Sequence, residues 1–190
     1  MRTKNIMIVG VGGQGSLLAS KLLGNLLVSS GYDVKVSEVH GMSQRGGSVV
    51  TYVRYGDKVY SPIIDEGEAD YIVSFEKLEA ARWLSYLKNG GTIIVNTQQI
   101  DPMPVIIGKE KYPEDILEKV KKTGAEVEEV DALKAAREAG SVKAVNIVLM
   151  AHLAKRLDIP FEKWEDALKA TVKPAFLELN MRAFKAGYNS

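Results

Sequence analysis

The distribution of hydrophobic residues divides the chain into two parts. Up to about residue 130, short apolar runs of strand length alternate with amphipathic stretches of helix length, and beyond about residue 145 the pattern is helical throughout. The runs that predict strands are Ile6–Val9, Val34–Ser37, Ser48–Tyr55, Lys58–Tyr60, Tyr71–Phe75, Thr92–Asn96, Val105–Gly108 and Glu126–Val130. The stretches that predict helices are Ser16–Ser30, Glu76–Lys88, Tyr112–Thr123, a segment ending at Ala139–Gly140, Val145–Leu157, Pro160–Thr171 and Pro174–Ala186.

This alternation predicts a three-layer, Rossmann-like α/β fold with a helical C-terminal portion, formed by residues 1–190 as a single domain. Gly56 and Asp57 separate Ser48–Tyr55 from Lys58–Tyr60, and this spacing indicates a β-hairpin. A hairpin interrupts the regular succession of strand and helix, so we expect a mostly parallel but mixed sheet. We find no internal repeat, low-complexity tract or linker that would divide the chain.

A glycine-rich turn follows the first predicted strand and opens the first predicted helix. Its sequence is Gly10-Val11-Gly12-Gly13-Gln14-Gly15. Gly10, Gly12 and Gly15 fill the G-x-G-x-x-G pattern in the required order of strand, turn and helix. Backbone amides at a helix N-terminus attract phosphate or carboxylate, so the turn is a candidate anion site. The alternative is a tight turn whose glycines only let helix and strand pack closely.

A chemically rich loop separates the next two predicted strands. It reads Glu38-Val39-His40-Gly41-Met42-Ser43-Gln44-Arg45-Gly46-Gly47. A simple connection between strands does not require an acid, an imidazole, an amide and a guanidinium among glycines. Glu38 also lies about twenty residues beyond the glycine turn, where a dinucleotide-binding fold places its ribose-binding acid. Since both loops follow strands, we expect them to border one crevice; the alternative is a glycine-rich loop solvated at a sheet edge.

Composition narrows the chemistry. The 190 residues include 25 basic and 24 acidic side chains, a balance that gives no reason to expect nucleic acid or anionic lipid as a partner. The chain has no cysteine, which excludes a disulfide framework, a thiol nucleophile and a cysteine-ligated iron–sulfur cluster on this chain. It has two histidines without a metal-ligand spacing, so we expect no metal site. The first strand begins so early that no signal peptide fits, and no apolar run could span a bilayer, so we expect a cytoplasmic protein.

Several other residues have plain structural interpretations. Ser43 is not in a nucleophile elbow, so a serine hydrolase is not indicated. Asn146 fits a helix N-cap and His152 a packed helix position. Three charged residues are expected to be solvated on a helix, namely Glu76, Glu79 and Arg82. Four aromatic residues at helical positions are expected in the core or at a subunit contact, namely Trp83, Trp164, Phe176 and Phe184. The apolar candidates for an exposed patch that a partner would cover are Trp164, Phe176, Leu177 and Phe184.

The glycine turn and the polar loop together carry a resemblance. The two strings, extended through Ser48 and Val49, are similar to the β subunit of indolepyruvate ferredoxin oxidoreductase and, more broadly, to the γ subunit or domain of the 2-oxoacid:ferredoxin oxidoreductases. The similarity continues through Ala69–Glu76, Gly90–Gly91, the helix with Asn146 and the segment Asn180–Phe184, so it covers nearly the whole chain. The glycine turn alone is unspecific; the string from His40 to Arg45 beside it is specific.

The resemblance implies an enzyme of more than one subunit. The family oxidatively decarboxylates a 2-oxoacid with thiamine diphosphate, passes electrons through iron–sulfur clusters to ferredoxin and forms an acyl-coenzyme A. The resemblance places thiamine diphosphate and the [4Fe-4S] clusters on a large α subunit, which makes this chain a partner subunit in a hetero-oligomer. The implied catalytic residues are His40, Ser43, Gln44 and Arg45. The implied cofactor-binding residues are Gly10, Gly12, Gly13, Gln14, Gly15, Glu38, Gly46, Gly47 and Asn146.

The sequence also supports two alternative hypotheses about function. The chain could be a stand-alone Rossmann-type NAD(P)-binding oxidoreductase, with Glu38 on the ribose and the glycines on the pyrophosphate, or a regulatory module that binds a nucleotide without chemistry. Arg45 has two interpretations as well. Its guanidinium can clamp a carboxylate or phosphate with two parallel hydrogen bonds, or it can tie the loop to Glu38 or Asp65.

Overall fold

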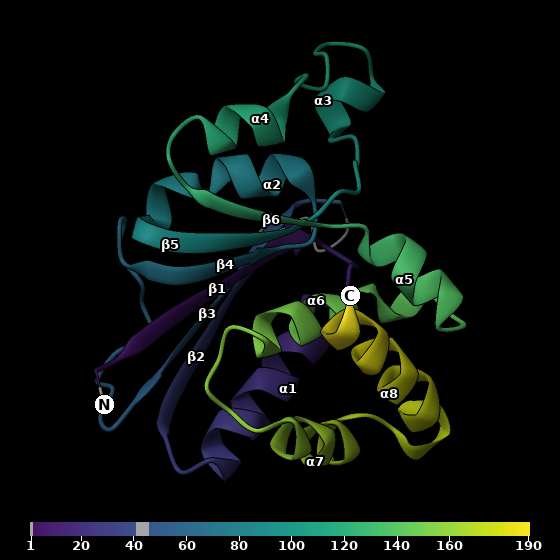
Figure 1. The fold of residues 1–190 in the computed structure, drawn as a ribbon. Helices are drawn as coiled ribbons and strands as arrows, with labels where there is room; N and C mark the ends of the chain where they lie inside the picture. The colour runs from purple at the N-terminus through teal and green to yellow at the C-terminus, as the bar shows by residue number, and fades with distance from the viewer. Residues whose placement is uncertain (1, 41–45) are drawn as a thin grey trace.

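A computed structural model describes residues 2–40 and 46–190, whose strands form a six-stranded sheet with helices on both faces (Figure 1). The strands are β1 (Lys4–Val11), β2 (Asp33–His40), β3 (Ser48–Gly56), β4 (Ala69–Ser74), β5 (Leu87–Asn96) and β6 (Glu126–Val130). The α-helices are α1 (Ser16–Ser29), α2 (Lys77–Arg82), α3 (Met103–Ile106), α4 (Ile116–Lys121), α5 (Ala132–Glu138), α6 (Val145–Ala154), α7 (Phe161–Thr171) and α8 (Pro174–Asn189). Two 3₁₀ segments are η1 (Leu84–Tyr86) and η2 (Val142–Ala144).

The sheet is mixed, as the sequence predicts. Its strand order is β2-β3-β1-β4-β5-β6. The neighbours β1, β4, β5 and β6 pair in parallel, whereas β3 runs antiparallel to both β1 and β2. The predicted fold class, a three-layer α/β arrangement with a helical C-terminal portion, is confirmed.

The predicted hairpin between Ser48–Tyr55 and Lys58–Tyr60 is wrong. Both edges of β3 are already occupied by β1 and β2, so the residues after Gly56 have no free edge to pair with. The backbone N–H of Val59 donates instead to the Asp33 carboxylate at 2.8 Å. The hairpin that makes the sheet mixed is β2–β3, in which His40 pairs with Val49 and the polar loop forms the connection.

Two hydrophobic cores lie on opposite faces of the sheet, because side chains alternate along each strand. Ile6 and Ile8 of β1 face the core formed with α1 and α5–α8, while Met7 and Val9 face the core formed with α2 and α4. The helix α6 is buried along its whole length, since it lies between the sheet and α8 (Figure 1). This position explains why its sequence has no polar face.

The C-terminal helices hold their large aromatic residues inside the first of these cores. Trp164 and Phe184 are fully buried, and their rings stack with centroids 5.5 Å apart. These two side chains are therefore core residues and not contacts for a partner. Phe176 is 54% exposed, and Leu177 is half-buried. Of the four apolar candidates, Phe176 is therefore the exposed one.

Two predicted helices are shorter than the sequence suggests. The stretch 76–88 contains α2, which ends at Arg82, and then η1; Leu87 pairs with Ala69, so the chain is already in β5 at Leu87. The stretch 112–123 contains α4, which begins only at Ile116. Pro113 disfavours helix in the residue before it, and Asp115 adopts a left-handed conformation with φ 54° just before the helix.

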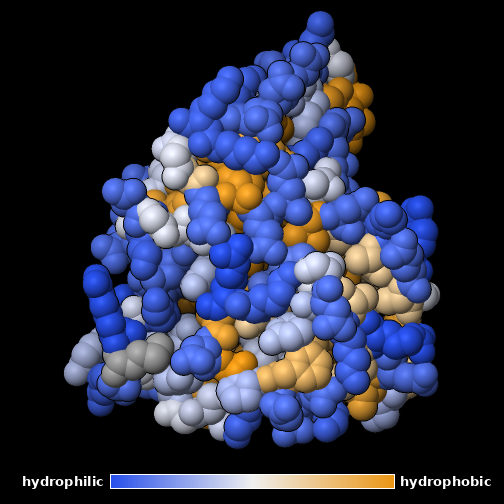
Figure 2. Space-filling view, in the orientation of Figure 1, coloured by the Kyte–Doolittle hydropathy of each residue, from blue (hydrophilic) through white to orange (hydrophobic). Residues whose placement is uncertain are grey.

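The segment Val105–Gly108, predicted as a strand, is not one. Its first residues belong to the short helix α3, whose first turn contains Pro104 and follows Pro102. The helix projects beyond α4 at the upper end of the molecule, away from the sheet (Figure 1). Because no strand of the described chain lies beside the run Val105–Gly108, its backbone cannot form β-sheet hydrogen bonds. Three side chains on and just after α3 are exposed, namely Met103, Ile106 and Ile107. Figure 2 shows an orange patch at the upper right, where α3 lies in the same orientation.

The remaining predicted elements are confirmed with small changes at their ends, namely β1, α1, β2, β3, β4, the Thr92–Asn96 part of β5, β6, α5, α6, α7 and α8. In the part of the chain that the structure describes, none of the helices has the length and apolar character needed to cross a bilayer.

Candidate functional site

The glycine turn between β1 and α1 has the backbone that its sequence requires. Gly13 and Gly15 adopt φ of 102° and 88°, in the left-handed region that side chains disfavour. The amides of Gly13, Gly15 and Ser16 donate no hydrogen bond to any described residue, and Gly15 is the N-cap of α1. The first amides of a helix lack carbonyl partners within the helix and lie at its positive end. The turn can therefore bind an anion.

Two side chains predicted to bind cofactor hold the turn in place. The Gln14 amide oxygen accepts from the Val11 N–H at 2.8 Å, and its amide nitrogen donates to the Phe75 carbonyl at 2.9 Å. Asn146 is 2% exposed and donates to the Gly15 carbonyl at 3.1 Å. Asn146 is not the N-cap of α6, because that position belongs to Ala144. The described contacts of Gln14 and Asn146 thus place them behind the turn, where they fix its shape.

The polar loop meets the glycine turn through the backbone. The Gly12 N–H donates to the Gly47 carbonyl at 2.9 Å, and the Gly46 N–H donates to the Gly12 carbonyl at 3.4 Å. The described ends of the two loops therefore lie side by side; that the loops border one crevice stays a prediction. His40 is the last residue of β2. The predicted catalytic residues Ser43, Gln44 and Arg45 lie outside the described residues.

Glu38 occupies a position that differs from the ribose-binding acid of a dinucleotide fold. Its carboxylate accepts a hydrogen bond from the Ser20 hydroxyl of α1 at 2.6 Å. In a dinucleotide fold the acid ends the strand beside β1, whereas here β3 lies between β1 and β2. Two strand spacings, about 10 Å, separate β2 from β1. The strand order therefore speaks against a stand-alone dinucleotide-binding oxidoreductase.

The edge that carries both loops is also a topological switch point. The helix α1, which follows β1, covers one face of the sheet, and α2, which follows the adjacent β4, covers the other (Figure 1). In open α/β sheets ligands bind outside the carboxyl ends of the strands at such a point. Asn96 closes the end of β5 there, with its amide nitrogen donating to the Phe75 carbonyl at 3.1 Å. Its amide oxygen is buried without a partner among the described residues.

Glu76 and Glu79 are not solvated, which corrects the sequence prediction. They are only 1% and 4% exposed. Glu76 caps α2 by accepting from the Glu79 N–H at 3.0 Å, and it also accepts from the Ile100 N–H at 3.2 Å and from the Tyr112 hydroxyl. Burial and then the hydrogen bond to Glu76 raise the pKa of the Tyr112 phenol, so the hydroxyl remains a donor.

Glu79 has its own set of donors. Its carboxylate accepts from the Ser48 hydroxyl, from Arg82 Nε at 3.1 Å and from Trp83 Nε1 at 3.3 Å. Arg82 itself is exposed, as predicted. The sequence does hold a signal for this pair, because Glu76 directly follows a buried strand and Glu79 stands three residues later, the spacing of a capping box.

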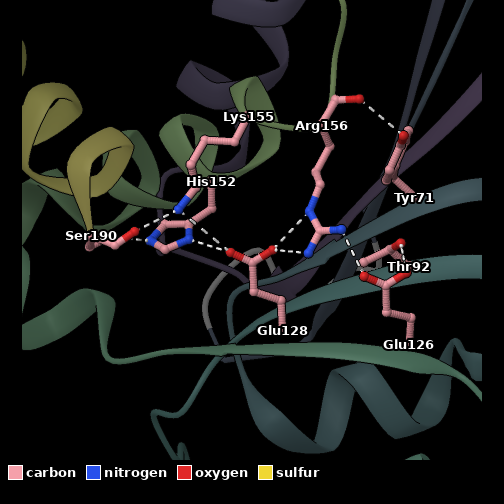
Figure 3. A network of polar contacts seen from close by, with 8 residues as sticks. All are labelled: Tyr71, Thr92, Glu126, Glu128, His152, Lys155, Arg156 and Ser190. Carbon is pink, nitrogen blue, oxygen red and sulfur yellow. Dashed lines mark hydrogen bonds and ion pairs between the residues drawn. The ribbon is translucent and has the colours of Figure 1, made fainter.

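A second polar network lies away from these loops and is structural (Figure 3). His152 of α6 is buried, with Nδ1 2.6 Å from the Glu128 carboxylate of β6 and Nε2 3.1 Å from the Ser190 hydroxyl. Arg156 bridges Glu128 and Glu126 at 2.8 and 2.7 Å. Burial lowers the pKa of His152, and its contact with Glu128 opposes that shift. The prediction of a packed helix histidine is confirmed.

Within the described residues, no group of three or more acidic or histidine side chains could hold a metal ion. The described part of the site consists of the backbone amides of the glycine turn, the ends of the polar loop and the side chains that hold them.

The fold is that of known oxidoreductase subunits. The chain superposes with a TM-score of 0.76 and 20% identity on the pyruvate oxidoreductase subunit PORC from Thermotoga maritima, covering 100% of this chain and 97% of that one. It superposes with a TM-score of 0.73 and 22% identity on the keto/oxoacid ferredoxin oxidoreductase gamma subunit from Geobacter sulfurreducens, covering 98% and 96%.

Sequence comparison gives the family. The family described as pyruvate ferredoxin/flavodoxin oxidoreductase matches residues 5–190, and the chain belongs to that family. It is 43% identical to the indolepyruvate oxidoreductase subunit IorB of Thermococcus kodakarensis, over 98% of this chain and 95% of the relative. It is 41% identical to the protein of the same name from Archaeoglobus fulgidus, over 97% and 94%. The resemblance noted from the glycine turn and polar loop is confirmed.

Proposed function

We propose that the chain is a subunit of a thiamine-diphosphate-dependent 2-oxoacid:ferredoxin oxidoreductase that acts on indolepyruvate or another aryl pyruvate. The observation that carries the proposal is the full-length likeness to relatives named as indolepyruvate oxidoreductase subunits, at 41–44% identity. In this proposal a large α subunit holds thiamine diphosphate and the [4Fe-4S] clusters, ferredoxin accepts the electrons, and coenzyme A takes the acyl group. The chain is inactive without its partner.

The composition supports this division of labour. The chain has no cysteine, so the thiolates that hold iron–sulfur clusters would belong to the partner. Thiamine diphosphate on the partner would supply the decarboxylation chemistry, and this chain would supply binding and electrostatics. The amides of Gly13, Gly15 and Ser16, which donate to no described residue, suit a phosphate or carboxylate, so they fit coenzyme A or the 2-oxoacid.

The residues of the polar loop have separate roles in the proposal. His40, Ser43, Gln44 and Arg45 are the residues assigned to the reaction, and Arg45 clamps a carboxylate or phosphate. Gly46 and Gly47 hold the loop against Gly12, which is the contact that their backbones make. Glu38, bonded to Ser20, contributes negative charge on the α1 side of the loop.

Reconstitution tests the proposed function. We expect indolepyruvate- and coenzyme A-dependent reduction of ferredoxin when the chain is mixed with its large subunit, and none with either subunit alone. Pyruvate and 2-oxoglutarate serve as control acids. Activity of the isolated chain with NAD(P)H, or an assembled complex that is inactive with every 2-oxoacid, would contradict the proposal.

A further inference from the structure

The polar loop returns to the sheet at Ser48. Ser48 is the first residue of β3 and pairs in register with Val11, the last residue of β1. It directly follows Gly46 and Gly47, whose backbones bond Gly12. The position of Ser48 therefore sets how the end of the loop lies against the glycine turn.

A buried acid from another element holds Ser48. The Ser48 hydroxyl donates to the carboxylate of Glu79, which lies on α2. Trp83 Nε1 is 3.3 Å from the same carboxylate oxygen and 3.4 Å from the Ser48 hydroxyl, and Arg82 donates to the other oxygen at 3.1 Å. The Glu79 side chain is 5% exposed. A buried carboxylate needs several donors to be tolerated, and this one has them.

The helix that carries Glu79 is itself fixed. Glu76 caps its first turn and bonds to Ile100 and Tyr112 of the following segment. The group that holds the loop is thus the Glu79 side chain, which lies on a fixed helix and not in the loop itself. A functional group that must be held within a fraction of an ångström needs such a second layer of support.

We propose that Glu79 is a positioning residue for the reaction: through Ser48 it holds Gly46 and Gly47, which end the polar loop, against the glycine turn. Glu79 touches neither substrate nor cofactor in this account. The inference rests on the proposed function, because the loop is assigned to substrate there. Glu79 lies outside the glycine turn and the polar loop, and the inference makes the activity depend on it.

The test compares two variants that each remove one hydroxyl bonded to a glutamate. Ser48→Ala removes the hydroxyl that donates to Glu79. Thr92→Val is the matched control, because the buried Thr92 hydroxyl donates to Glu126 at 3.1 Å in β5 and β6, outside the contacts of the loop. Ser48→Thr retains a hydroxyl and should restore wild-type behaviour.

Hydrogen exchange on the full chain gives a readout that does not need activity. We expect the Gly12 and Gly46 amides, which bond across the two loops, to exchange about fivefold faster in Ser48→Ala, as loss of one hydrogen bond implies. In Thr92→Val and Ser48→Thr they should stay within about twofold of the wild type. Unchanged exchange in Ser48→Ala would overturn the inference whatever the enzyme does.

Kinetics of the reconstituted complex separate positioning from stability. We expect Ser48→Ala to raise the KM of either the 2-oxoacid or coenzyme A about fivefold, while the KM of the other stays within about twofold. A merely structural loss would lower kcat through the active fraction and leave both KM values unchanged, which would overturn the inference. An inactive wild-type complex would instead count against the proposed function, while the exchange result would still decide the inference.

Discussion

At the scale of single residues, the shape of the glycine turn depends on contacts that exclude any side chain. A Cβ added to Gly15 would lie 2.6 Å from the Asn146 amide nitrogen, and the residue has a φ of 88°. Gly13 has a φ of 102° but no atom within 4 Å of an added Cβ. A side chain at Gly13 would meet only backbone strain, whereas one at Gly15 would meet both strain and a steric clash, so comparing the two positions distinguishes the two effects.

We expect Gly15→Ala to lower the free energy of unfolding by about 2–4 kcal/mol, the sum of left-handed strain and overpacking against Asn146. Gly13→Ala should cost only the strain, about 1–2 kcal/mol. Urea unfolding of the two variants measures both values. Equal losses would show that the contact between Gly15 and Asn146 does not constrain the turn.

The buried imidazole of His152 predicts a pH dependence of stability. Its pKa is lowered in the folded chain, first by burial and then by the positive charges of Lys155 and Arg156, which the bond to Glu128 only partly offsets. As pH falls through about 6.5 the unfolded chain takes up this proton first, so the free energy of unfolding should fall. We expect His152→Gln to weaken this dependence between about pH 7.5 and 5.5. Identical pH slopes in the two proteins would refute this role of His152.

At the scale of elements, α2 is the one whose surroundings the sequence describes least well. Glutamates on a short helix are usually solvated, and nothing in their spacing states that Tyr112 and Ser48 will approach from distant segments. The same holds for α3, where an apolar run of strand length forms an exposed helix because no strand edge lies beside it. Local pattern gives the type of an element; its burial depends on what the rest of the chain brings to it.

We expect Glu76→Ala to lower the free energy of unfolding by about 2–4 kcal/mol, because it removes a helix cap and leaves the half-buried Ile100 amide and Tyr112 hydroxyl without this acceptor. Glu178→Ala is the control, since that side chain is 90% exposed in an ion pair with Arg182. The control should change stability by less than about 1 kcal/mol. A comparable loss in both variants would mean that Glu76 is solvated in solution.

At the scale of the whole molecule, the layers were predictable because they follow from the succession of strands and helices. The strand order was not, since local pattern cannot say that β3 enters between β1 and β2. That insertion decides how Glu38 is interpreted, because it separates the acid from the glycine turn. Of the candidate site, the glycine turn and its meeting with the polar loop were predictable; the supporting roles of Gln14, Asn146 and Glu79 depend on contacts between distant segments.

The prediction for Arg45 rests on the sequence and is tested in the assembled enzyme. We expect Arg45→Ala to lower kcat/KM of the reconstituted complex more than about tenfold, since loss of a charged clamp in a partly desolvated site costs about 2–5 kcal/mol. The thermal midpoint of the chain should be unchanged. Arg137→Ala, an exposed arginine at the end of α5, is the control and should leave both unchanged. A rate within about twofold together with a lower midpoint would show that Arg45 is structural.

The composition of the native complex decides whether the chain is a subunit whose partner carries the cofactors. The chain, isolated from its own cells under anaerobic conditions, should co-purify with one larger, cysteine-containing subunit. Iron, sulfide and thiamine diphosphate should all remain with that subunit when the two are separated, and ferredoxin reduction with indolepyruvate should return when they are recombined. A chain that purifies alone, or that retains iron or thiamine diphosphate after separation, would contradict the account.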